Sequence, residues 1–443
     1  MKLMKNIGLL FLLCLAMPLI VSCVDLDENP PSDLSPQNFY TSESEYNAAL
    51  TGIIKALYSD WSGFDYGYDL ILASGAEDIR SDADLFKNFD RLVPNDRELV
   101  IHDFWMKCYQ AISNANTLIS KLQNAKDVSA EKLDALEGQA RFLRAFTYFY
   151  LVRFFGPVQV TTYENQNNIE TVKQSSVAEV YDAILEDLSI AEVKLPLSFA
   201  EKGRPTRGAA KTLMAKVYLT MTGWPLNDKS YYVLARDKAA EVMDEKYGYD
   251  LEDDFSDLWK QSNKLKSKEF IFTFYGSVAE DGVAGSHMDL ATRYFGNGEG
   301  GWGDYFSETR FFDAFPEGPR KDATFTSVFA DGTTFTEAGV EPFIAKYSDG
   351  GRRVNTSSEG FRPILRFADV LLIYAEAANY VNNGPDQGRW MHSTGYIAGD
   401  GVKVPHIHSG HPKMNLTGLS WRKEHGSLLA KGTGGMTLSG ERW

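Results

Sequence analysis

Two short stretches of the chain combine aromatic residues with glycine and carboxylates, a mixture suited to binding a ligand with flat faces and many hydroxyl groups. Aromatic rings stack on the apolar faces of sugars, while Asp, Asn and Arg side chains exchange hydrogen bonds with hydroxyls. DWSGFDYGYD supplies the candidates Trp61, Tyr66 and Tyr68, and RYFGNGEGGWGDYF supplies Tyr294, Asn297, Trp302, Asp304 and Tyr305. The alternative interpretation is that these aromatic residues only pin their loops to the rest of the fold.

A third polar stretch, GAEDIRSDAD, follows the first one closely and contains Asp78, Arg80 and Asp82. These side chains are candidates for hydrogen bonds to ligand hydroxyls beside Trp61. A solvated polar turn accounts for the same residues, so both interpretations stay open at this point.

Motifs of the common catalytic and metal sites are absent from the sequence. It has no Gly-x-Ser-x-Gly elbow, no His-Glu-x-x-His and no phosphate-binding Gly-x-x-x-x-Gly-Lys. Asp and Glu are abundant, but no motif selects a glycosidase-like pair. His406, His408 and His411 have a spacing that could gather nitrogen ligands around zinc or nickel, without carboxylates to orient them. We therefore expect a binding protein with no enzymatic activity, no cofactor and no metal.

The first 23 residues have the pattern of an export signal. Lys2 and Lys5 precede an apolar run at 7–21, and Ser22 comes directly before Cys23. The four residues Ile-Val-Ser-Cys resemble a bacterial lipobox, in which the cysteine sulfur carries a lipid. An ordinary cleaved signal with an incidental cysteine is the alternative. Acidic residues and prolines at 23–37 predict an extended tether behind a lipid anchor.

Cysteine count and charge limit the class of protein further. Once Cys14 leaves with the signal and Cys23 carries lipid, only Cys108 remains, so the exported chain has no internal disulfide. Cys108 lies in a helical pattern and is expected to be a small buried apolar residue. The formal net charge of −15 disfavours nucleic acid as a partner.

Helical periodicity dominates the first half of the chain. Ser42 and Glu45 form a capping-box pattern, and apolar residues then recur at helical spacing. The segments predicted to be helical are 38–61, 103–125, 129–155, 176–195, 206–223, 230–245 and 364–384. Paired amphipathic helices with small residues at close approaches indicate a mainly α fold, a tetratricopeptide-like helical superhelix.

The rest of the chain departs from this pattern. Residues 255–363 are rich in glycine and aromatic residues and contain strand-like pieces such as EFIFTFYG at 269–276. We therefore predict an inserted loop-rich region with a few short strands. The expected organisation is a signal at 1–22, a tether at 23–37, a helical region at 38–250, a loop-rich and C-terminal region at 251–387, and an atypical tail at 388–443.

Several of these segments together resemble the SusD/RagB family of outer-membrane nutrient-binding lipoproteins. The most specific is EGQARFLRAFTYFYLVRFFGPV, which is similar to the family's signature helix with its Phe-Gly turn. RPTRGAAKTLMAKVYL and RFADVLLIYAEAAN resemble two further family helices, the second of which carries Glu376 and Asn379, to which we assign structural roles. FDAFPEGPRKDATF is similar to a fourth pattern, interrupted by Glu317-Gly318. The resemblance covers residues 23–385 and ends beyond Gln387, where a frameshift or truncation would explain the loss of pattern.

The resemblance implies a surface lipoprotein of the outer membrane that captures an oligosaccharide or polysaccharide and passes it to a SusC-like TonB-dependent transporter. Two alternatives remain open: a helical docking scaffold without a glycan ligand, and a binder of peptides or another nutrient. Exposed aromatic residues on the two loops favour glycan capture, whereas buried ones favour the scaffold.

Overall fold

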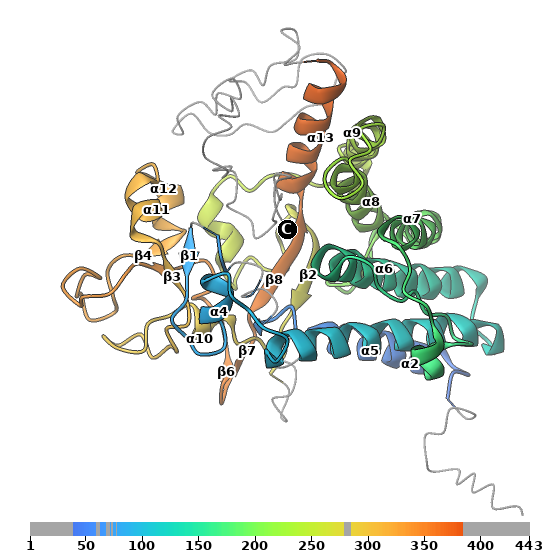
Figure 1. Ribbon diagram of the computed structural model, residues 1–443, viewed down its shortest axis with the longest axis horizontal. Coiled ribbons are helices and arrows are strands. Elements are labelled where there is room, and N and C mark those ends of the chain that lie inside the picture. The colour runs from blue at the N-terminus through green and yellow to red at the C-terminus, as the bar shows by residue number, and fades with distance from the viewer. Residues whose placement is uncertain are drawn as a thin grey trace, which may run out of the picture.

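The computed structural model describes residues 39–58, 63–67, 71, 74–76, 78–278 and 285–383. Figure 1 shows long helices stacked on one side, a loop-rich region with short strands and helices on the other, and a two-stranded ribbon between them. The predicted mainly α fold with a tetratricopeptide-like stack and a loop-rich insertion is confirmed. The predicted signal, tether and His-rich tail, with Cys23, lie outside the described residues, as do Trp61 and Tyr68.

Each predicted long helix is present, with ends set by local chemistry. Ser42 and Glu45 form the predicted capping box, and Ser176 and Glu179 form a second one. Gly156, at a φ of 71°, ends the signature helix, because only glycine adopts this conformation without strain. The helices are α2 (Glu43–Leu57), α5 (Leu99–Lys121), α6 (Ala130–Phe155), α7 (Val177–Lys194), α8 (Arg207–Met221), α9 (Tyr231–Val242) and α13 (Phe367–Val381).

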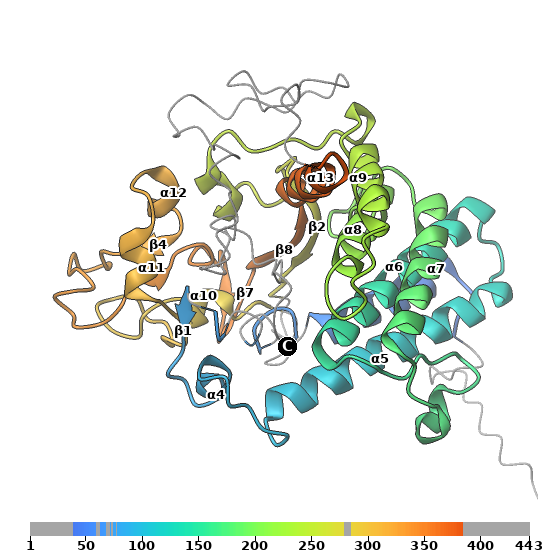
Figure 2. The same ribbon diagram turned by 45° about the horizontal axis from the view of Figure 1, so that its top comes forward.

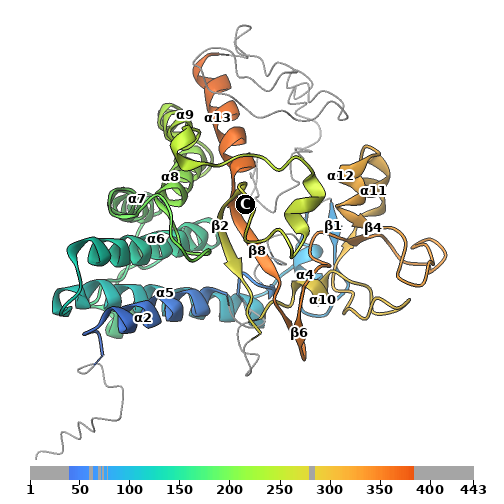
Figure 3. The same ribbon diagram turned by 180° about the vertical axis from the view of Figure 1, so that it is seen from behind.

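The loop-rich region is organised by short strands. β2 (Phe270–Tyr275) pairs antiparallel with β8 (Phe361–Arg366), which continues directly into α13. A four-stranded sheet has the order β1-β3-β5-β4, from β1 (Ile79–Arg80), β3 (Phe306–Ser307), β5 (Phe343–Ile344) and β4 (Phe325–Thr326). β6 (Arg353–Val354) and β7 (Ser357–Ser358) form a hairpin. Seen from behind in Figure 3, the β2–β8 ribbon lies between the helices and this sheet.

Short helical turns complete the described chain. The α-helical turns are α4 (Lys87–Asp90), α10 (Met288–Ala291), α11 (Thr309–Ala314) and α12 (Pro319–Asp322). The 3-10 turns are η3 (Leu122–Asn124), η4 (Gln166–Thr171), η5 (Glu245–Tyr247) and η6 (Phe255–Trp259). Most of these turns position loops, because few of their side chains are buried; α10 is the exception, since all four of its side chains are buried.

Aromatic side chains join the helices to the ribbon. Phe146 of α6 is fully buried, and its ring centroid lies 5.9 Å from that of Phe272 and 6.0 Å from that of Phe274 on β2. Phe142, one helical turn earlier, contacts Phe272 edge-on at 4.9 Å. Each buried ring removes a large apolar area from water. This cluster therefore fixes the position of the loop-rich region against the helical stack.

A buried polar network ties three helices together. Arg144 of α6 makes two hydrogen bonds to the Asp187 carboxylate of α7, at 2.8 and 2.7 Å. The same guanidinium donates to the Asn116 side chain of α5, whose amide donates to the carbonyl of Thr161 at 3.1 Å. Burial by itself lowers the pKa of Arg144, but hydrogen bonding to Asp187 and its charge raise the pKa above its ordinary value.

One further sequence prediction is answered by the helical part. Cys108 is completely buried on α5, as expected, and this burial raises the pKa of its thiol well above the ordinary value. Within the described part of the chain, none of the helices combines the length and the apolar character needed to span a bilayer.

Candidate ligand-binding site

The two aromatic stretches singled out in the sequence lie against each other in the fold. The Tyr66 hydroxyl donates a 2.6 Å hydrogen bond to the Asp304 carboxylate, although the residues are far apart in the chain. Ser81, from the third polar stretch, donates to the Asp304 carbonyl at 2.6 Å. Figure 2 shows the elements around this point, β1, α4 and α10, gathered on one side of the molecule. The candidate site is therefore built from 63–67, 78–82 and 293–307.

Asp65, the neighbour of Tyr66, binds a second segment, which begins at His287. Its carboxylate accepts hydrogen bonds from the backbone N–H of His287, at 3.0 and 3.2 Å, and lies 2.9 Å from the imidazole Nδ1. Asp65 is fully buried, and His287 directly precedes α10. We name Asp65 and Tyr66 the clamp, because these adjacent residues bind His287 and Asp304, respectively.

Trp302 lies in the chain between His287 and Asp304, the two residues that the clamp contacts. Its backbone N–H donates to the Leu290 carbonyl at 2.8 Å, so the tryptophan is fastened to α10. Its indole packs nearly parallel to the His287 ring at 5.9 Å and edge-on to Tyr66 at 5.6 Å. The side chain is partly exposed. Its orientation is thus fixed by contacts to Tyr66 of the first stretch and to residues 287–290.

The glycine-rich loop beyond α10 is cross-linked by its own polar groups. Asn297 donates to the Asp331 carboxylate at 2.9 Å, and the Glu299 carboxylate accepts from the Ala330 N–H at 2.8 Å. The Arg293 guanidinium donates to the Asp289 carbonyl at 2.9 Å. Asn297 has a φ of 54°, a left-handed conformation that Asn tolerates better than most residues. These contacts give the loop one defined shape.

Comparison with known proteins assigns the family. A family model described as SusD-like, "Starch-binding associating with outer membrane", matches residues 26–219, and the SusD family model matches residues 330–393. The chain belongs to the SusD/RagB family. SusD-like protein P2 of Formosa agariphila is 27% identical over 398 residues, which cover 83% of this chain and 77% of that protein.

Solved structures agree with the assignment. A SusD superfamily protein from Parabacteroides distasonis has a TM-score of 0.67 at 27% identity, covering 78% of each chain. A laminarin-binding SusD-like protein has a TM-score of 0.64 at 25% identity, covering 77% of this chain and 81% of the other. The SusD-like fold predicted from the sequence is confirmed.

Two of the aromatic residues predicted to contact ligand are buried in this SusD-like fold. Tyr66 is 2% exposed and Tyr305 is 1% exposed, so neither presents a ring face to solvent. Tyr305 instead packs near Phe86 at 5.7 Å, and its hydroxyl lies 3.3 Å from that of Ser74. As stacking surfaces for a ligand these two predictions are wrong. Both rings pack against Phe86, the residue before α4, and so support the loops.

Asp304 is likewise committed to internal structure. Burial raises the pKa of its carboxyl above the ordinary range, and the hydrogen bond from Tyr66 offsets part of that rise. Burial and the charge of Asp304 in turn raise the pKa of Tyr66 well above its ordinary value. The pair therefore acts as an internal hydrogen bond at neutral pH, with Tyr66 as the donor.

The third stretch contains a two-residue strand, which neither of the two sequence interpretations anticipated. Ile79 and Arg80 form β1 and pair with Ser307 and Phe306 of β3. The Arg80 guanidinium lies 2.7 Å from the Glu341 carboxylate and also pairs with Asp82. Asp78 is partly buried and its backbone carbonyl accepts from the Glu308 N–H at 3.0 Å. Arg80 thus joins β1 to the segment before β5.

Sequence reasoning missed three residues that matter at the site. Asp65 and His287 carried no motif, and only the fold brings them together. Phe295 lies within the stretch that was singled out, and it is 68% exposed, more than any of the aromatic residues chosen there. The sequence did contain a signal for this exposure, because Phe295 lies between Tyr294 and a glycine in a polar loop. Among the residues that the structure describes, no group of three or more His, Cys, Asp or Glu side chains is arranged to hold a metal.

Proposed function

We propose that this SusD-like protein captures an oligosaccharide or polysaccharide on the surface around the glycine-rich loop, without catalysing a reaction. The observation that carries the proposal is the placement of Trp302, partly exposed and held in one orientation by α10, His287 and Tyr66. A rigid indole offers a stacking surface for a sugar ring at a low cost in conformational entropy. The laminarin-binding protein of the same fold supports a carbohydrate as the ligand class.

The burial of Tyr66 and Tyr305 is what the alternative of a docking scaffold predicts. The rest of the site favours a ligand, because Trp302, Tyr294 and Phe295 keep part or most of their surface accessible. A scaffold has no need of a cross-linked loop that presents aromatic residues to solvent. Glycan capture therefore remains the function that we propose.

Replacing Trp302 by alanine is expected to weaken polysaccharide binding at least about tenfold, as for a buried aromatic anchor of an interface. The measurement is affinity electrophoresis of the full chain, carrying Cys23→Ser so that no lipid is attached, against laminarin and a panel of plant and host polysaccharides. Trp302→Ala should lose the retardation by the polysaccharide that slows the parent chain.

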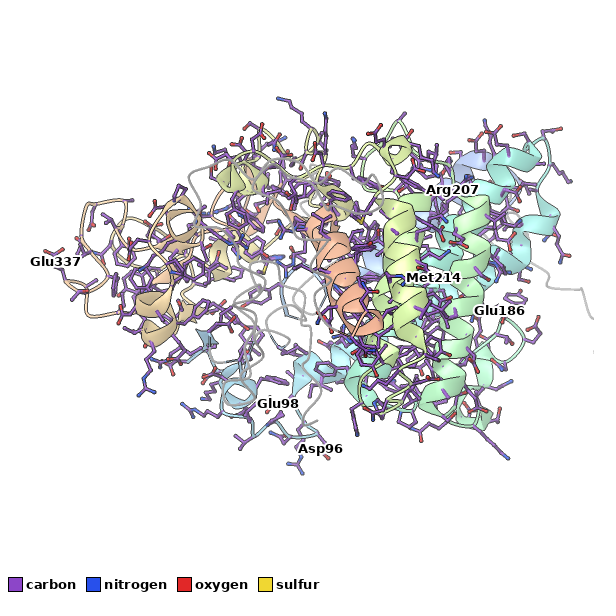
Figure 4. All side chains as sticks on the ribbon, turned by 90° about the horizontal axis from the view of Figure 1, so that it is seen from above. Asp96, Glu98, Glu186, Arg207, Met214 and Glu337 are labelled. Carbon is purple, nitrogen blue, oxygen red and sulfur yellow. The ribbon has the colours of Figure 1, made fainter. Side chains whose placement is uncertain are left out.

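Trp224→Ala is the matched control, because Trp224 is 64% exposed but follows α8 on the helical side. Figure 4 separates the two sides, with Glu186 of α7 and Glu337 of the loop-rich region at opposite ends of the molecule. This control should migrate like the parent chain. Equal loss in both variants, or none in Trp302→Ala, would contradict the placement of the site. A folded parent chain that no polysaccharide retards would favour the scaffold or a non-glycan ligand.

We further propose that Cys23 carries a lipid that anchors the protein to the outer membrane at the cell surface, and that a SusC-like TonB-dependent transporter receives the glycan. Cys23→Ser is expected to move the protein from the detergent phase to the aqueous phase of a Triton X-114 extraction, because acyl chains supply the membrane affinity. An unchanged partition would contradict the anchor. Affinity purification of the lipidated chain from outer membranes tests the transporter, whose absence from the eluate would contradict the hand-off.

A further inference from the structure

Phe295 is placed as a surface feature and not as part of the core. It is 68% exposed, whereas its neighbour Tyr294 is partly buried, with ring contacts to Phe329 and Phe343 at 5.3 Å each. Burying a phenylalanine stabilises a fold because it removes a large apolar area from water. The exposed Phe295 ring does not obtain this stabilisation, whereas Tyr294, Trp302 and Tyr305 of the same loop pack against other rings. A single exposed apolar residue is ordinary on a protein surface. Whether this ring can serve as a binding surface therefore depends on how firmly its neighbours hold it.

The Phe295 ring is supported from beneath by the loop. Its Cδ1 would lie 3.3 Å from a Cβ added at Gly303, so the glycine leaves the space that the ring edge occupies. Tyr294 contacts it from the side, with ring centroids 4.4 Å apart. Gly303 has a φ of 69° and donates its N–H to the Arg293 carbonyl at 2.8 Å. The ring therefore rests on a backbone that is itself hydrogen-bonded to the start of the loop.

Hydrogen-bonding groups lie within the same loop. Asn297 uses its amide N–H to bind Asp331, and among the described residues its carbonyl oxygen accepts no hydrogen bond. Gly301 donates to the Tyr294 carbonyl at 2.8 Å, which closes the loop on both sides of Phe295. An aromatic face with an acceptor oxygen two residues further along the loop suits a pyranose ring, which has a C–H face and hydroxyls around its edge.

We propose that Phe295 is a stacking surface for a pyranose unit of the bound glycan, with the Asn297 side-chain oxygen accepting from a hydroxyl of the same or an adjacent unit. This inference rests on the proposed function and extends the contact surface beyond Trp302 along the glycine-rich loop. Because phenylalanine has neither N–H nor O–H, Phe295 contributes contact with the C–H face alone. Selectivity among sugars at this position therefore depends on the hydrogen bond to Asn297.

Four substitutions at the loop test the proposal in the full chain carrying Cys23→Ser, with the polysaccharide that retards the parent chain and, by calorimetry, its oligosaccharides. Phe295→Ala should raise the dissociation constant at least about tenfold, the loss expected for removing a stacked aromatic contact. Phe295→Leu keeps apolar bulk without a flat face and should be nearly as weak. Phe295→Tyr keeps the face and should stay within about twofold of the parent. Asn297→Asp loses the donor to Asp331 and sets two carboxylates side by side, so it should weaken binding, and binding equal to that of the parent would contradict the role given to Asn297.

The outcomes separate this inference from the proposed function. Thermal unfolding of Phe295→Ala should match the parent chain, because an exposed ring contributes little to stability. If the parent chain binds and Trp302→Ala does not, while Phe295→Ala binds as the parent does, the stacking role of Phe295 is overturned and the proposed function stands. Equal binding by the leucine and tyrosine variants would also overturn stacking. A parent chain that binds no glycan overturns both.

Discussion

Replacing Asp187 by alanine is expected to lower the free energy of unfolding by about 3–5 kcal/mol, the cost of removing one partner of a buried ion pair. Asp187 is 4% exposed and accepts two hydrogen bonds from Arg144 and one from Arg141 at 2.9 Å. Arg141 keeps a second partner, because its Nε lies 2.7 Å from Glu137. Arg144 keeps only the Asn116 side chain among its partners in this network, so its charge becomes largely uncompensated inside the protein.

Urea unfolding followed by circular dichroism at 222 nm measures this loss. Asp187→Asn retains the shape and part of the hydrogen bonding, so it should fall between the parent chain and the alanine variant. Glu43→Ala is the matched control, since Glu43 pairs with Lys132 at 2.6 Å with both side chains about half exposed. Exposed pairs contribute about 0–1 kcal/mol. Similar losses for Asp187→Ala and Glu43→Ala would contradict the role given to the buried network.

Replacing Phe146 by alanine is expected to cost about 3–5 kcal/mol, the range for removing a large aromatic side chain from a packed core. The ring contacts α6 neighbours and both Phe272 and Phe274 of β2, so its loss leaves a cavity between the helical stack and the ribbon. The surrounding rings belong to different elements and cannot all move into that space. The variant should therefore unfold at lower urea concentration and also show weaker glycan binding at temperatures near its transition.

Met106→Ala is the control for this change, because Met106 lies on α5 and is 56% exposed. It should stay within about 0.5 kcal/mol of the parent chain. Measurement by urea unfolding at one temperature compares both variants directly. A loss at Phe146 no larger than the loss at Met106 would mean that the contact between α6 and β2 does not hold the loop-rich region in place.

Local chemistry determined the helical framework from the sequence. The Ser42 and Ser129 hydroxyls accept hydrogen bonds from the first turns of α2 and α6, the Glu45 carboxylate accepts from the Ser42 N–H, and Gly156 ends α6. Such signals act within four residues, so reading along the chain is enough to find them. The burial of Cys108 followed from helical spacing for the same reason.

The candidate ligand-binding region was determined only in outline. Glycine among Trp, Tyr and Asp correctly marked 293–306 as a loop, and the fold places 63–67 against it. Which ring faces outward was not predictable, because Tyr294, Phe295 and Tyr305 have similar side chains and lie a few residues apart. Their exposure depends on Phe329, Phe343 and Phe86, which come from distant segments.

The tertiary structure alone decided the roles of Asp65, His287 and Arg80. Asp65 and His287 are separated by 222 residues in the chain, and no spacing rule connects them. The sequence left Arg80 open between a partner for ligand hydroxyls and part of a solvated turn, whereas the pairing of β1 with β3 brings it to Glu341. Composition and periodicity report the local environment of a residue, whereas the role of a buried charge depends on the partner that compensates it. In this protein the sequence therefore determined the helices and the loops, and long-range packing decided which side chains support the candidate site and which face solvent.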